Sequence, residues 1–124
     1  MVKTKRAYEP AARADGFRVL VDRLWPRGVT KQAARVDLWA RDLAPSPELR
    51  KWFGHDPDRF AAFAVRYRHE LARGPARAAL EDLVHRASRG TVTLVYGARD
   101  EEHNGAVVLK AEIESALGGP AARR

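Results

Sequence analysis

The sequence predicts a small three-layer α/β domain, in which a short, mostly parallel sheet of three or four strands is flanked by about four or five helices. Two runs rich in β-branched and apolar residues, at 17–24 and 91–96, are typical of buried strands. The stretch between them has helical periodicity and is long enough for the crossover that joins parallel strands. The length of 124 residues indicates a single domain, placed at 1–117, with a flexible tail at 118–124.

The first strands are predicted from alternation and from turn residues. Residues 3–8 alternate weakly and indicate an edge strand, and residues 9–16 contain proline and Asp-Gly and indicate a connector. In residues 17–24 apolar side chains occupy both faces, which is typical of a strand covered on both sides. The strand is expected to end at the Trp-Pro-Arg-Gly sequence at 25–28, because proline donates no ladder hydrogen bond and glycine allows a sharp turn.

Short capped segments follow. Thr30 can cap a helical turn, whereas residues 36–43 are ambiguous and favour an extended conformation. Ser46 followed by Pro47 indicates the N-cap and the first position of a helix, and Gly54 indicates its end.

Three longer helices and another strand complete the predicted order. Asp56 repeats the cap signal, and Gly-Pro at 74–75 separates two helices, the second of which ends at Gly90. The first of these helices has an apolar face made by Phe60, Phe63, Ala64, Tyr67 and Leu71. Residues 91–96 then predict a central strand, and Asp100 is expected to cap the last helix.

The composition disfavours several classes of protein. The chain contains no cysteine and therefore no disulfide framework, thiolate metal site or thiol nucleophile. It lacks a membrane-spanning apolar run and the apolar centre of a signal peptide, so a cytoplasmic location without membrane contact is expected. It also lacks the G-x-S-x-G, G-x-G-x-x-G and Walker sequences, which argues against a serine hydrolase and against ordinary nucleotide-binding motifs. No cofactor is expected, and the sequence indicates no oligomeric state.

The chain is strongly basic, with a formal net charge of +7 and a pI near 10.4. Such a charge attracts nucleic acid through counterion release, so a basic nucleic-acid-associated module is one alternative. However, the basic residues form no block, and 18 of the 23 are arginine in an alanine-rich sequence. This distribution favours compositional bias, and we predict only weak, non-specific nucleic-acid binding.

Several blocks of the sequence resemble the YeaO-like family of small bacterial proteins. These blocks are DGFRVLVDRLWPRGVTK at 15–31, LAPSPELRKWFGHDP at 43–57, the helix that contains Phe63 and Tyr67, and VTLVYGARDEEHN at 92–104. They occur in order and cover nearly the whole chain. The family has no known function, so the resemblance implies a fold and candidate positions but no reaction.

The chain departs from the longer members that it resembles. Those members carry a Cys-His-Arg run after the last strand, whereas this chain has only His103, between Glu102 and Asn104. Thiol chemistry therefore cannot be carried over from them.

Candidate binding residues follow the two strongest strands, because ligands of open α/β sheets bind beyond the carboxyl ends of parallel strands. If these strands are parallel neighbours, the loops at 22–28 and 96–104 converge and bring guanidinium groups beside a carboxylate, an imidazole and an amide. Arginine side chains match the geometry of phosphate and carboxylate groups. The residues expected to bind a ligand are Arg23, Arg27, Lys31, Tyr96, Arg99 and Asn104.

Candidates for acid–base chemistry are His103 and His55, with Asp22 as the carboxylate that orients the imidazole. His55 lies between two predicted helices, inside a block that carries the family resemblance. We expect Arg23, Arg27 and His103 to share one pocket, with Asp22 close enough to hydrogen-bond at least one of them.

Acidic residues near this pocket complicate the prediction. Asp100, Glu101 and Glu102 are expected in the first turn of the last helix, where they would repel an anion. Anion binding would then depend on Arg23, Arg27 and Lys31. A metal site made by Asp22, Asp100 and His103 is a weaker alternative.

Three functional interpretations stay open. The first is a domain that binds an anionic small molecule, such as a nucleotide-like one, at the strand ends. The second is the nucleic-acid-associated module, and the third is a non-catalytic partner-binding domain. In the third, Arg23 and Arg27 would simply pair with nearby acids such as Asp22 or Asp100 to hold loops together.

Overall fold

A computed structural model describes residues 1–118 of the chain. Its centre is a four-stranded sheet in the order β1-β4-β2-β3, in which all neighbouring strands are parallel. The strands are β1 (Val2–Arg6), β2 (Phe17–Leu20), β3 (Leu38–Trp39) and β4 (Val92–Tyr96). The α/β fold class is confirmed, as are the edge position of β1 and the central position of β4. The predicted tail, except Gly118, lies outside the described residues.

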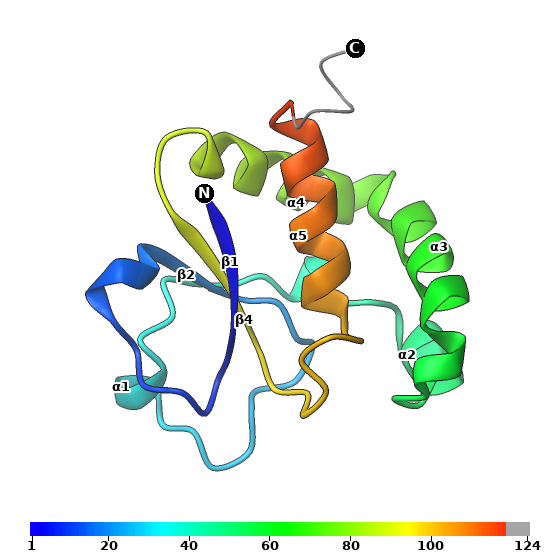
Figure 1. The fold of residues 1–124 in the computed structure, drawn as a ribbon, viewed down its shortest axis with the longest axis horizontal. Coiled ribbons are helices and arrows are strands. Elements are labelled where there is room, and N and C mark those ends of the chain that lie inside the picture. Colours follow the sequence, from blue (N-terminus) through cyan, green and yellow to red (C-terminus); the bar gives the residue numbers. More distant parts are fainter. Residues whose placement is uncertain (119–124) are drawn as a thin grey trace.

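Helices cover one face of the sheet (Figure 1). These helices are α3 (Phe60–Leu71), α4 (Gly74–Ala87) and α5 (Gly105–Ala116), preceded by the shorter α2 (Pro47–Phe53). Their apolar sides and the facing strand residues form the main core, as the periodicity predicts. The predicted face of α3 is buried at Phe63, Ala64, Tyr67 and Leu71.

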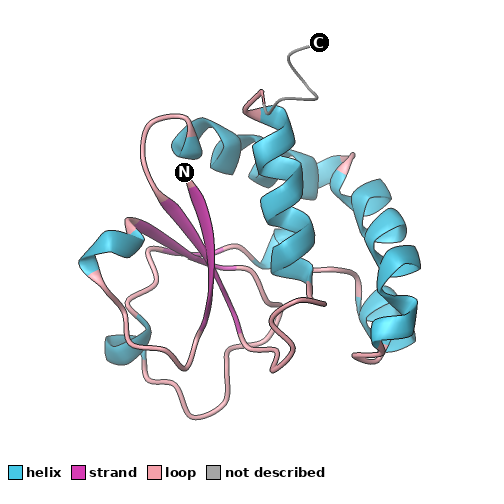
Figure 2. Cartoon of the chain, viewed as in Figure 1, coloured by secondary structure: helices cyan, strands magenta, loops and turns pink. Residues whose placement is uncertain are grey.

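The opposite face of the sheet has a much thinner cover. Leu20 and Val95 point to this side, where they pack against Trp25 and Trp39. The segment that supplies the cover is mostly loop, and α1 (Lys31–Ala34) is its one helical turn (Figure 2). The third layer of the domain is therefore thin and irregular.

Local capping signals account for the short helices. The Ser46 hydroxyl accepts a hydrogen bond from the Leu49 amide at 3.2 Å, and the Thr30 hydroxyl accepts one from the Ala33 amide at 3.1 Å. Gly54 ends α2 with a φ of 54°, a left-handed conformation that glycine adopts without strain. These predicted caps are confirmed.

Two predicted extended segments had wrong boundaries. The strand predicted at 17–24 ends at Leu20, because the chain turns away after Val21. The extended segment predicted at 36–43 contains only the two residues of β3 and then a 3-10 turn. The cap signal at Asp56 is confirmed, and it caps a 3-10 turn at Pro57–Arg59 that leads directly into α3.

The last helix begins later than predicted. Asn104 is the N-cap of α5, and its Oδ1 accepts a hydrogen bond from the Val107 amide at 3.0 Å. Asp100 instead holds a turn in the preceding loop, where its Oδ1 accepts hydrogen bonds from the Glu102 and His103 amides. The prediction that Asp100 caps this helix was wrong. Asp100 and Asn104 are both common N-cap residues and lie four positions apart, but only Asn104 stands directly before the first helical residue.

A buried ion cluster lies near the start of β2. The Asp15 carboxylate accepts a hydrogen bond from Arg18 Nη1 at 2.6 Å and from Lys5 Nζ at 3.1 Å. Arg18 also donates from Nε and Nη2 to the Ala34 carbonyl, at 3.0 and 2.7 Å. Burial alone would raise the pKa of Asp15, but hydrogen bonds from the Ala12 amide, Lys5 and Arg18 lower it below its ordinary value.

This lowered pKa predicts acid sensitivity. Because ionised Asp15 is stabilised in the folded state, its contribution is complete above the unfolded pKa of about 3.9 and is lost as pH falls through the folded pKa. Urea unfolding between pH 6 and 3 should therefore show a larger loss of stability in the wild type than in Asp15→Asn. Parallel losses in the two proteins would contradict this role.

Within residues 1–118, no helix is both long and apolar enough to cross a membrane.

Candidate functional site

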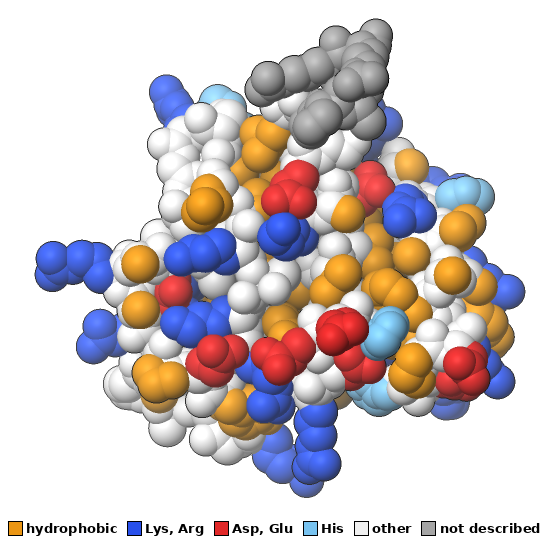
Figure 3. All heavy atoms as spheres, in the orientation of Figure 1, with side chains coloured by type: hydrophobic (Ala, Val, Ile, Leu, Met, Phe, Trp, Pro, Cys, Tyr) orange, Lys and Arg blue, Asp and Glu red, His pale blue; other side chains and the backbone are white. Residues whose placement is uncertain are grey.

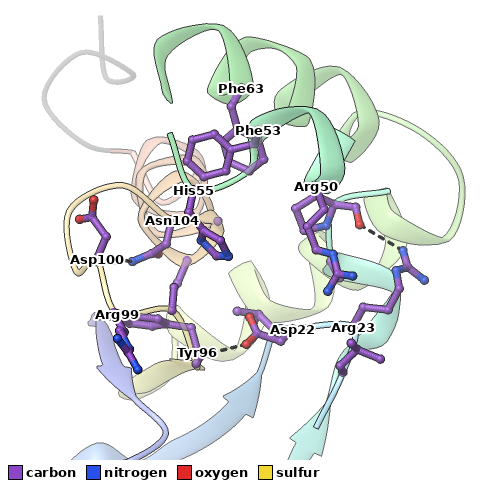
Figure 4. A pocket seen from close by; sticks show the side chains of 18 residues that line it. Asp22, Arg23, Arg50, Phe53, His55, Phe63, Tyr96, Arg99, Asp100 and Asn104 are labelled. Carbon is purple, nitrogen blue, oxygen red and sulfur yellow. Dashed lines mark hydrogen bonds between the residues drawn. The ribbon is translucent and has the colours of Figure 1, made fainter. Parts of the chain in front are cut away.

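A cavity of about 580 Å³ opens at the carboxyl ends of β2 and β4 (Figure 4). Because these strands are parallel neighbours, the loops that follow them lie side by side, at 21–24 and 97–100. The start of α5 and residues of α2 and α3 complete the wall. This is the position at which open α/β sheets hold ligands.

Asp22 links the two loops at the base of the cavity. Its Oδ2 accepts a hydrogen bond from the Gly97 amide at 2.8 Å. A Cβ atom at residue 97 would lie 3.2 Å from this oxygen, so glycine permits the close approach. Burial raises the pKa of Asp22, although the hydrogen bond from the Gly97 amide and the nearby Arg50 and His55 side chains oppose the shift.

Three arginines line the cavity, and they come from different parts of the chain. Arg23 follows β2, Arg50 lies on α2 and Arg99 follows β4. Arg23 and Arg50 lie together on one side in Figure 4, and Arg99 lies on the other.

None of these three guanidinium groups forms an ion pair within the described residues, in contrast to the paired Arg18 and Arg68. Arg23 Nη2 donates to the Pro45 carbonyl at 3.3 Å, while its Nε is buried without a partner. The three guanidinium groups are therefore not neutralised by direct ion pairs within the described residues, although the carboxylates of Asp22 and Asp100 line the same cavity.

The first turn of α5 adds to the positive potential. Gly105 and Ala106 line the cavity, and the first turn contains no acidic residue. The sequence-based expectation that Asp100, Glu101 and Glu102 occupy this turn was wrong, because all three belong to the preceding loop. The helix N-terminus therefore carries no acidic side chain of its own, but Asp100 in the preceding loop lines the cavity and would still repel an anion.

The other side chains of the wall are largely apolar or aromatic. Phe53 and Phe63 stack with ring centroids 4.3 Å apart and an interplanar angle of 20°. His55 is exposed beside them, 6.3 Å from the Phe53 ring centroid, and its ring points into the cavity (Figure 4). Tyr96 also lies on the wall, and burial raises the pKa of its hydroxyl.

The structure brings together most of the predicted site residues. Those that line the cavity are Asp22, Arg23, His55, Tyr96, Arg99, Asp100 and Asn104. Asn104 has a structural role as well, because Nδ2 donates to the Asp100 carbonyl at 2.8 Å while Oδ1 caps α5.

Arg27, Lys31 and His103 lie outside the lining, so the expected pocket shared by Arg23, Arg27 and His103 is not formed. The turn closed by the Val29 amide and the Pro26 carbonyl leaves Arg27 exposed, and Lys31 begins the exposed first turn of α1.

His103 is held away from the cavity by its own neighbours. Its Nδ1 lies 2.9 Å from Asp100 Oδ2, and its ring packs edge-on against Phe60. The hydrogen bond from the Glu102 amide and the contacts with His103 lower the pKa of Asp100. The weaker metal alternative of Asp22, Asp100 and His103 is not assembled: in residues 1–118 no three acidic, histidine or cysteine side chains are grouped to hold an ion.

Sequence reasoning missed Arg50 and Phe53 as site residues. They lie three positions apart on α2 and therefore share a helix face, and this helix directly precedes His55. The sequence spacing of Arg50 and Phe53 shows that they share a helix face, but it does not show that this face of α2 lies toward the carboxyl ends of the strands.

Charges elsewhere on the molecule are mixed. On the face drawn in Figure 3, basic and acidic side chains are interspersed, and several acids form a row beside histidine. This face presents no single basic stripe.

The fold and the cavity define a small parallel α/β domain with a ligand-sized opening at its strand ends. Comparison of sequences gives the family: the chain belongs to the family described as "Inactive DUF488-N3 subclade", whose model matches residues 1–122. The resemblance to YeaO-like proteins is thereby confirmed.

Relatives cover most of the chain. The uncharacterized protein YeaO of Escherichia coli is 40% identical over 108 residues, which span 87% of this chain and 92% of YeaO. The uncharacterized protein Rv3073c of Mycobacterium tuberculosis is 45% identical over 108 residues, which span 87% of this chain and 89% of the relative. No solved structure matches.

Proposed function

We propose that the domain binds a small organic anion in the cavity at the strand ends and does not catalyse its conversion. The observation that carries the proposal is the group of three arginines, Arg23, Arg50 and Arg99, which line one cavity without ion pairs in the described residues. Guanidinium groups in a partly enclosed site bind phosphate and carboxylate groups through charge-assisted hydrogen bonds. The first turn of α5 contributes amide donors to the same space.

Two observations support binding without catalysis. The lining contains no serine, threonine, cysteine or lysine, so a covalent intermediate on one of these four side-chain types cannot form at this cavity. The matched family is described as inactive, and the chain has Glu102 and Asn104 on either side of His103, where the longer proteins it resembles carry Cys-His-Arg.

The proposal predicts the behaviour of Arg50→Gln. Arg50 is exposed and its side chain has no hydrogen-bond partner among the described residues, so the substitution should change unliganded stability by at most about 0.5 kcal/mol. In the wild type, a bound ligand at about 100 times its dissociation constant should add about 2.7 kcal/mol of stability. We expect thermal-shift measurements with organic phosphates and carboxylates to show this stabilisation, and Arg50→Gln to remove most of it.

Arg89→Gln is the matched control, because Arg89 is also exposed but lies outside the cavity. It should retain the full ligand-induced shift, as should Arg27→Gln. Equal shifts in Arg50→Gln and the wild type would refute anion binding at this cavity.

Weak nucleic-acid binding stays a prediction from the charge alone. It should be non-specific and fall steeply with salt, with a log–log slope near −0.9 for each phosphate contacted. Tight, sequence-selective binding at about 150 mM salt would instead favour the nucleic-acid-associated module.

A further inference from the structure

The cavity has an apolar part that an inorganic anion would leave unused. Leu24 lines it with 61% of its surface exposed, so this side chain contributes little to the folded core. His55 presents an exposed ring to the same cavity, next to the ring of Phe53. An exposed leucine and an exposed imidazole at one opening offer contacts for an apolar or flat ligand group.

The size of the cavity agrees with an organic ligand. A volume of about 580 Å³ lies within the range of about 300–1,000 Å³ that holds cofactor-sized or drug-sized molecules. Phosphate alone would fill only a small part of it.

Asp22 indicates that the ligand carries hydrogen-bond donors. Its Oδ2 accepts a hydrogen bond from the Gly97 amide, and Oδ1 forms no hydrogen bond with the described residues. A carboxylate weakens the binding of a bare anion through charge repulsion, but it accepts hydrogen bonds from hydroxyl or amino groups. In Figure 4, Arg23 and Arg50 lie on one side of Asp22, and Arg99 lies on the other.

We infer, on the basis of the proposed function, that the ligand belongs to the class of nucleoside monophosphates. The phosphate binds to Arg50 and Arg23, the ribose hydroxyls donate to Asp22, and the base contacts His55 and Leu24. A sugar phosphate would leave the apolar part empty, and an aromatic carboxylate without hydroxyl groups would leave Asp22 unpaired. A nucleoside monophosphate has a group for each part of the site: the arginines, Asp22, and the apolar part at His55 and Leu24.

A graded series of ligands tests this inference by isothermal titration calorimetry. The probes are inorganic phosphate, ribose 5-phosphate, AMP, UMP and adenosine. We expect at least one of the two nucleotides to bind at least tenfold more tightly than ribose 5-phosphate, because contact with the base adds affinity. Ribose 5-phosphate should in turn bind more tightly than phosphate, and adenosine should bind more weakly than AMP.

Two variants test the parts of the site separately. Leu24→Ser should weaken nucleotide binding at least threefold and leave ribose 5-phosphate unchanged, and Val65→Ser, at an exposed position of α3 outside the cavity, should change neither. Asp22→Asn can keep the hydrogen bond from the Gly97 amide while it removes the charge. It should weaken ribose 5-phosphate and nucleotides about tenfold and leave phosphate unchanged or more tightly bound. Unliganded thermal unfolding of each variant shows whether the fold is retained.

The outcomes separate the inference from the proposed function. If phosphate, ribose 5-phosphate and nucleotides bind equally well and all depend on Arg50, the anion site stands and the nucleotide class is overturned. If adenosine binds as well as AMP and Arg50→Gln has no effect, the anion site itself is refuted. If none of the probes binds at millimolar concentration, the nucleotide inference fails, and the wider screen of organic phosphates and carboxylates decides the proposed function.

Discussion

Replacement of Phe63 by alanine is expected to lower the free energy of unfolding by about 3–5 kcal/mol. Phe63 is only 2% exposed, stacks on Phe53 and lies 5.6 Å, centroid to centroid, from Tyr67. Its removal leaves a cavity between α2 and α3 that rigid neighbouring rings cannot fill. Urea unfolding of the wild type and the variant measures the difference.

Val65→Ala is the matched control on the same helix, because Val65 is 51% exposed. It should change stability by no more than about 0.5 kcal/mol. A loss below about 1 kcal/mol for Phe63→Ala would show that this face of α3 does not pack as described.

Replacement of Arg18 by alanine should cost about 3–5 kcal/mol as well, for a different reason. Arg18 and Asp15 are each 3% exposed, and the guanidinium group supplies hydrogen bonds to the carboxylate and to the Ala34 carbonyl. Without it, Asp15 stays buried with Lys5 as its remaining charged partner, and the Ala34 carbonyl loses its donors. Chemical unfolding at neutral pH measures this loss.

The exposed ion pair of Arg77 and Glu81 on α4 provides the comparison. Arg77→Ala removes the same type of side chain from a solvated pair, which contributes only about 0.3–0.5 kcal/mol. Similar losses for the two arginine variants would show that the cluster around Asp15 is not structurally important.

The parts of the fold that the sequence predicted correctly depend on local interactions. The caps at Thr30 and Ser46 and the glycine end of α2 need only neighbouring residues, so they could be recognised without tertiary structure. The strand at 91–96 could be recognised because every residue from Val92 to Tyr96 is buried and the run is rich in β-branched residues.

The wrong predictions concern choices between nearby alternatives. Asp100 and Asn104 are both good capping residues, and packing of α5 on the sheet decides between them. The position of Asp22 and Arg23 at the cavity followed from the rule for parallel strand ends. The directions of Arg27 and His103 could not be predicted, since each is set by a turn and its own hydrogen bonds. Arg50 was missed because the orientation of α2 depends on long-range packing.

The unequal cover of the sheet has a consequence for motion. Segment 22–39 packs on only a small apolar cluster, whereas α3, α4 and α5 share the main core. This segment can therefore open locally at a lower free energy than the rest of the domain. It carries Asp22 and Arg23, so one wall of the cavity belongs to the less stable part of the molecule and the opposite wall, at the start of α5, to the more stable part. A ligand that bridges the two walls stabilises the closed form of the segment, so that binding and local ordering are thermodynamically coupled.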